Sequence, residues 1–74
     1  MKKGNALLKF YRSRLGLTQY ELAERLGIKE RIITLWETNR ATPGIETMVD
    51  VARVLQTDPA EIWPKAFSSK EAVR

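Results

Sequence analysis

The sequence contains neither cysteine nor histidine, and these two absences remove several kinds of chemistry. Without cysteine, the chain forms no disulfide and offers no thiolate to a metal ion. Without histidine, it lacks the common zinc ligand and the usual side chain for acid–base catalysis at neutral pH. No nucleophile paired with a base and no phosphate-binding glycine loop stand out either. We therefore expect no cofactor, no metal and no enzymatic activity.

Long apolar runs are also missing, since none exceeds a few residues. A membrane-spanning helix needs about 20 consecutive apolar residues, and a signal peptide needs a shorter one behind a basic start. We therefore expect no membrane association and a cytoplasmic location. The 74 residues are enough for one domain with a small core.

Charge is present in both signs, with 13 basic and 9 acidic residues and a formal net charge of +4. The distribution is uneven. Residues 1–17 hold five basic side chains and no acidic one, whereas residues 41–63 hold four acidic side chains and one arginine. A surface that is basic on one side suits a polyanion such as nucleic acid. A mixed, solvated surface is the alternative that charge alone leaves open.

Residues 19–26 carry the signals of a short amphipathic helix that ends in a tight turn. Thr18 with Glu21 three residues later is a capping-box pattern. Gly27 adopts a positive φ at no steric cost, so the chain can end the helix and turn within about three residues. This segment therefore predicts the first half of a helix-turn-helix.

The second half is predicted at residues 30–38. Ile33 and Trp36 are three residues apart and share the face that packs against the preceding helix. The polar side chains of this segment, together with Leu35, are left on the outside. In a helix-turn-helix, this outer face enters the major groove of DNA.

Three more helices are expected around this pair. Apolar residues recur at helical spacing in residues 5–15 and 45–55, and the second of these stripes begins at Ile45. A short helix is expected to begin at Asp58, where Glu61 completes a second capping box.

The order of these motifs resembles the Cro/C1-type helix-turn-helix family of phage repressors and bacterial regulators. The resemblance covers roughly residues 6–63. It rests on Leu-Thr-Gln-Tyr-Glu-Leu-Ala-Glu-Arg-Leu-Gly-Ile at 17–28, Trp-Glu at 36–37 and Pro-Gly-Ile-Glu-Thr-Met at 43–48. It implies an all-α fold, a compact five-helix lambda-repressor-like bundle, as a DNA-binding domain over residues 1–63. Residues 64–74 are then a short tail, either disordered or at a dimer interface.

Arg12 is expected on the apolar side of the first helix, where a charge needs a partner. Glu37, next to Trp36, is the best candidate, and family members carry an ion pair at the matching positions. We predict an Arg12–Glu37 salt bridge that joins the first helix to the third. The alternative is two exposed charges.

Phosphate contacts are expected on both sides of the third helix. Thr18 and Gln19 lie at the N-terminus of the second helix, which is a ready anion site. The resemblance implies this role for Gln19, whose alternative is that of a solvated polar residue. Lys29 stands where the family usually has a serine or threonine cap, and it is expected near a phosphate. Arg40 and Thr42, with the backbone N–H groups around them, are expected to hold a second phosphate.

Base reading is assigned to Glu30, Arg31, Thr34 and Leu35. Arg31 can bind guanine O6 and N7 with two hydrogen bonds, and Glu30 can accept from cytosine N4. Leu35, where many relatives have a polar residue, can cover a thymine methyl group. Thr34 can reach a base or a phosphate. The alternative is a solvated helix face, which would leave Leu35 exposed without a purpose.

Trp63 directly follows Ile62, which is expected in the core, so the two cannot easily share one helical face. An exposed tryptophan indicates a protein interface. Trp63 and Phe67 are therefore expected to form a homodimer interface, with Trp63 lying over the edge of the core as the alternative.

These features predict a sequence-specific transcriptional regulator, a repressor, that binds double-stranded DNA as a homodimer. Two alternatives use the same DNA-binding fold. One is the antitoxin of a toxin–antitoxin pair, with the toxin as a protein partner, and the other is the controller of a restriction–modification system. An alternative of another class is a protein–protein adaptor that kept the fold and lost DNA binding.

Overall fold

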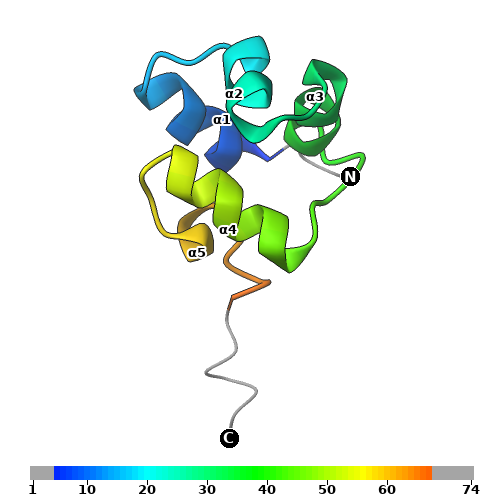
Figure 1. Cartoon of the computed structure of the whole chain (residues 1–74). Coiled ribbons are helices and arrows are strands. Elements are labelled where there is room, and N and C mark those ends of the chain that lie inside the picture. Colours follow the sequence, from blue (N-terminus) through cyan, green and yellow to red (C-terminus); the bar gives the residue numbers. More distant parts are fainter. Residues whose placement is uncertain (1–4, 68–74) are drawn as a thin grey trace, which may run out of the picture.

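The structure, a computed structural model, describes residues 5–67 and contains five helices (Figure 1). Their bounds are α1 Ala6–Arg14, α2 Gln19–Leu26, α3 Glu30–Glu37, α4 Ile45–Val54 and α5 Pro59–Ile62. No strand occurs in this part of the chain, and the predicted all-α, five-helix fold is confirmed. None of these helices is long and apolar enough to span a bilayer. Residues 64–67 of the expected tail form a turn, and the rest of the tail lies outside the described residues.

Local interactions define both ends of α2. The Thr18 hydroxyl accepts the Glu21 N–H at 3.0 Å, and the Glu21 carboxylate accepts the Thr18 N–H at 2.8 Å, so the predicted capping box is present. At the other end, Gly27 has φ 72° and ψ 30°, the left-handed conformation that glycine adopts readily. The Ile28 N–H then donates to the Ala23 carbonyl at 3.0 Å, and the chain turns directly into α3.

The start of α5 differs from the predicted capping box. The Asp58 carboxylate accepts the Ala60 N–H at 2.9 Å, so Asp58 caps the helix as expected. The Glu61 carboxylate, however, accepts the Tyr11 hydroxyl at 3.1 Å. The expectation that Glu61 completes a capping box is therefore wrong, because Glu61 connects α5 to α1 instead.

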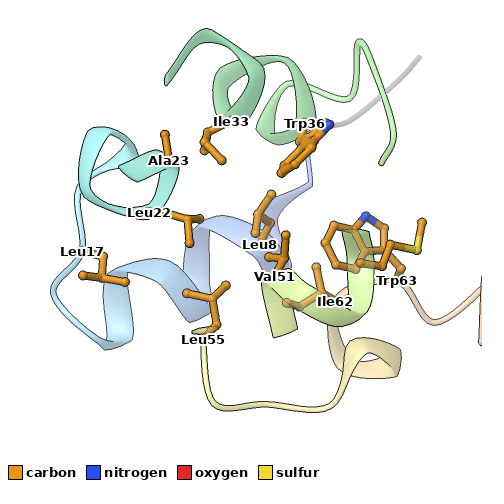
Figure 2. Close-up of a cluster of buried hydrophobic side chains, with 11 residues drawn as sticks. Leu8, Leu17, Leu22, Ala23, Ile33, Trp36, Val51, Leu55, Ile62 and Trp63 are labelled. Carbon is orange, nitrogen blue, oxygen red and sulfur yellow. The ribbon is translucent and has the colours of Figure 1, made fainter. Parts of the chain in front are cut away.

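The core lies between the helices and draws residues from all of them (Figure 2). Leu8 of α1 is fully buried near its centre, between the side chains of α3 and those of α4. The other buried members of the cluster are Leu17, Leu22, Ala23, Ile33, Trp36, Met48, Val51, Leu55, Ile62 and Trp63. The predicted stripe of α4 begins one turn later than expected, because Ile45, its first residue, is 53% exposed.

Trp63 is buried, with 8% of its surface exposed, and the expectation of an exposed tryptophan is wrong. The physical reason is that α5 stops at Ile62, while Trp63 has φ −126° and ψ 68°. Outside the helix, two successive side chains can both face inward, as Ile62 and Trp63 do in Figure 2. Phe67 is partly buried and packs against the same core. The proposed dimer interface through Trp63 and Phe67 therefore loses its basis.

Arg12 and Glu37 form an ion pair that joins α1 to α3. Arg12 Nε donates to Glu37 Oε2 at 2.6 Å, and Nη2 donates to Oε1 at 3.0 Å. Nη1 of the same guanidinium donates to the Leu17 carbonyl at 2.8 Å. The two side chains are only 11% and 6% exposed, so each charge is balanced by its partner and not by water.

We predict that the variant Glu37→Ala loses about 3–5 kcal/mol of unfolding free energy, because Arg12 then stays buried without a counter-charge. Urea unfolding followed by circular dichroism measures the loss. The matched control is Asp50→Ala, which breaks the exposed Arg53–Asp50 pair and should cost less than about 1 kcal/mol. A loss below about 1 kcal/mol for Glu37→Ala as well would contradict a structural role for the pair.

Glu21 predicts a pH dependence of stability. Its hydrogen bonds with the Thr18 N–H and hydroxyl lower the pKa of Glu21 from the ordinary value of 4.5. A lowered pKa means that the ionised capping box stabilises the fold above pH 4.5 and that this contribution disappears as pH falls through the lower, folded pKa. Wild type should therefore melt at a higher temperature than Glu21→Gln at pH 7, and the difference should shrink below pH 4.5. A difference that stays constant down to pH 3 would count against this assignment.

Candidate nucleic-acid interface

The rotation of α3 about its axis is set by two buried side chains. Ile33 and Trp36 are buried and point toward Leu8 and the centre of the core (Figure 2). This inward face is the one that the sequence predicts. It leaves the opposite side of α3 as a surface of the molecule, beside α2, with which α3 makes its most extensive contact (Figure 1).

The four side chains assigned to base reading lie on this outer surface, although not equally. Glu30, Arg31 and Thr34 are exposed. Leu35 is half-buried and lies outside the core cluster, so it is less exposed than expected but still available at the surface. Ile32, in contrast, packs against the core and does not belong to this face.

The N-terminus of α2 has the geometry of an anion site. The N–H groups of Gln19 and Tyr20, the first two of the helix, have no partner among the described residues. The Thr18 hydroxyl is occupied by the capping box, since its oxygen accepts the Glu21 N–H and its hydrogen bond to the Glu21 carboxylate lowers the pKa of Glu21. Tyr20 donates its hydroxyl to Glu24 at 2.9 Å, and this bond raises the pKa of Tyr20, so the phenol stays neutral beside the helix end.

Gln19 is not the free surface amide that the sequence suggests. Its Nε2 donates to Glu37 Oε1 at 3.0 Å, and its Oε1 accepts the Thr34 hydroxyl at 2.7 Å. Sequence reasoning missed this network, since the three residues come from two helices. One signal was available, because Thr34 and Glu37 are three residues apart and must share the side of α3 that faces the start of α2.

Lys29 lies at the N-cap position of α3 and makes no capping hydrogen bond with its side chain. This agrees with the chemistry of an ammonium group, which has no lone pair to accept an N–H. The side chain is exposed, and Glu30 supplies the acidic group in the first turn. A positive charge therefore stands at the start of α3, where the helix leaves the turn.

The loop after α3 has exposed side chains that could contact a phosphate, but fewer free backbone N–H groups than expected. The N–H groups of Arg40 and Ala41 both donate to the Leu35 carbonyl, at 2.8 and 3.2 Å. The N–H groups of Arg40 and Ala41 are therefore not free for a phosphate, because they close the end of α3, whereas a phosphate contact by the rest of this loop stays a prediction. The side chains of Arg40 and Thr42 are exposed and keep their expected donors.

The start of α2 has free N–H groups, and three cationic side chains, those of Lys29, Arg31 and Arg40, are exposed on α3 and at its two ends. Residues 5–67 contain no group of three acidic side chains that could hold a metal ion. The chemistry that these groups offer is hydrogen-bond donors and positive charge.

Comparison with known proteins identifies the family. The helix-turn-helix family model matches residues 8–62. A protein of Methanothermobacter thermautotrophicus, named as an uncharacterized HTH-type transcriptional regulator, is 38% identical over 55 residues, which are 74% of this chain and 80% of the relative. A protein of Archaeoglobus fulgidus with the same name is 29% identical over 66 residues, 78% of this chain and 93% of the relative. No solved structure matches the chain significantly. The chain therefore belongs to the Cro/C1-type helix-turn-helix family.

Proposed function

We propose that this protein is a sequence-specific DNA-binding regulator that reads the major groove with the outer face of α3. The observation that carries the proposal is the orientation of α3. Burial of Ile33 and Trp36 leaves Arg31 and Thr34 exposed, and Thr34 bonds to Gln19 at the open N-terminus of α2. A helix presented in this way fits the major groove, while the helix before it crosses the phosphate backbone.

Two kinds of contact follow from the chemistry of these groups. Arg31 pairs with guanine O6 and N7, Glu30 accepts from cytosine N4, and Leu35 covers a thymine methyl group. Phosphates on either side are held by the N-terminus of α2 with Thr18 and the second N–H of Gln19, by Lys29, and by Arg40 with Thr42. The base contacts supply specificity, whereas the phosphate contacts supply most of the affinity and its salt dependence.

Repression is the regulatory outcome that this mode of binding supports. A protein seated in the major groove excludes other proteins from the same base pairs. If the protein binds as a dimer, its second copy would occupy an adjacent DNA half-site one helical turn away, about 34 Å along the duplex.

A salt titration tests DNA binding itself. The logarithm of the affinity for a random duplex should fall linearly with the logarithm of the salt concentration. The slope should be about −0.9 for each phosphate that a lysine or arginine side chain neutralises. The variant Lys29→Ala should reduce the slope by about 1 and weaken all sequences alike. Arg53→Ala on α4 is the matched control, because it removes an exposed arginine far along the chain from the proposed surface. No binding by wild type even at low salt would instead support a protein–protein adaptor.

The variant Arg31→Ala should behave differently. On the specific site, which can be selected from a pool of random duplexes, it should cost about 1–3 kcal/mol of binding free energy and relax the preference at one base position. On random DNA, its effect should be no larger than that of Lys29→Ala. If both variants lose affinity equally on specific and random DNA, Arg31 contacts the backbone and the assignment of the reading face is wrong.

A further inference from the structure

We propose that Glu37 and Gln19 fix the hydrogen-bonding polarity of Thr34, so that Thr34 meets DNA only as an acceptor and selects adenine or cytosine. This inference rests on the proposed function, because it names the base chemistry that one residue of the α3 surface recognises. Glu37 and Gln19 are positioning residues in it, and Thr34 is the residue that touches the base.

The chain of hydrogen bonds begins at Glu37. A carboxylate can only accept, and this one is held on the inside of α3 by Nε and Nη2 of Arg12, with 6% of its side chain exposed. Its Oε1 also faces the Gln19 amide at 3.0 Å. Only the NH₂ end of that amide can face a carboxylate, since two oxygens would repel each other. The orientation of Gln19 is therefore imposed by chemistry.

The imposed orientation decides what happens at Thr34. With its NH₂ end toward Glu37, the Gln19 amide must turn its oxygen toward Thr34, and the two oxygens are 2.7 Å apart. A hydroxyl has a single hydrogen, and at this distance that hydrogen must lie between them. What Thr34 has left for an external partner is its lone pairs. Its side chain is exposed, so those lone pairs are accessible from outside.

An acceptor on the α3 surface discriminates between bases. In the major groove, cytosine presents the N4 donor and adenine presents the N6 donor beside the N7 acceptor, whereas guanine (O6 and N7) and thymine (O4) present only acceptors. Thr34 can therefore bond to adenine or cytosine on the contacted strand, while guanine or thymine there would face it with like lone pairs. An isolated threonine would not discriminate, because its hydroxyl can rotate to donate or to accept.

The test measures base preferences by selection from a random duplex pool. Wild type should prefer adenine or cytosine over guanine or thymine at one position by about fivefold, the effect of one ordinary hydrogen bond. Thr34→Val keeps the shape and removes the hydroxyl, so the preference at that position should vanish. Thr34→Ser restores a hydroxyl and should restore the preference. Thr34 is exposed, and circular dichroism checks that both variants fold.

Two further variants test the positioning roles. Gln19→Met releases the Thr34 hydroxyl. The ratio of adenine or cytosine to guanine or thymine at the base position that Thr34 contacts should therefore fall toward one, while the preferences at other base positions persist. In Glu37→Gln, the amide oxygen can keep the bond from Arg12 Nε, while the NH₂ group takes the place of Oε1, faces Gln19 and forces Arg12 Nη2 to give up its bond. The Gln19 amide would then turn over and donate to Thr34, which would free the Thr34 hydrogen. The preference should then move away from cytosine and toward bases that present an acceptor, namely guanine, thymine and adenine through N7.

The outcomes separate this inference from the proposed function. If wild type selects no sequence at all, the proposed function fails. If wild type selects a site but Thr34→Val keeps every preference, or Gln19→Met leaves the ratio unchanged, the inference is overturned and the proposed function stands. Because the Thr34 and Gln19 variants decide it, the result does not depend on whether Glu37→Gln folds.

Discussion

The structure depends most on the hydrogen-bonding requirement of one buried carboxylate, that of Glu37. An ionised carboxylate away from water is costly unless its lone pairs are used. Here Arg12 on α1 donates twice and Gln19 on α2 donates once, so three helices meet at one group on α3. Apolar burial supplies most of the stability of such a bundle, but it tolerates small rotations of its helices. The carboxylate does not, because a rotation of α3 would break directional bonds.

This constraint explains how a small core presents a defined surface. Ile33 and Trp36 anchor one side of α3 in the core. Glu37, the last residue of α3, fixes the helix through its bond to Gln19 at the start of α2. The residues left outside then have no freedom to exchange faces. A recognition helix must keep its side chains within hydrogen-bonding distance of chosen base edges. For that role, the fixed rotation of α3 matters more than the stability that the Glu37 bonds add.

Much of this could be predicted from the sequence because it is local. The capping box at Thr18, the turn at Gly27 and the inward face of α3 each depend on residues within a few positions of one another. What failed depends on where a helix stops or on which helices meet. Trp63 was placed outside because the helical pattern was continued past its actual end. Glu61 was given a local partner, but tertiary packing brought Tyr11 to it. The Gln19 network falls in the same class, since a periodic pattern does not show contacts between helices.

In the proposed complex, Gln19 connects two kinds of DNA contact that are usually treated separately. Its amide has two N–H donors, of which one is given to Glu37 and one is left for a phosphate. Its oxygen holds the Thr34 hydroxyl. Under the proposed mode of binding, the same planar group anchors the backbone and sets what one base position reads. A change at Gln19 must therefore alter affinity and specificity together, whereas Lys29 and Arg31 can each vary alone. Of the residues on this surface, those at the α2–α3 contact can therefore least change the preferred DNA base without also weakening DNA binding.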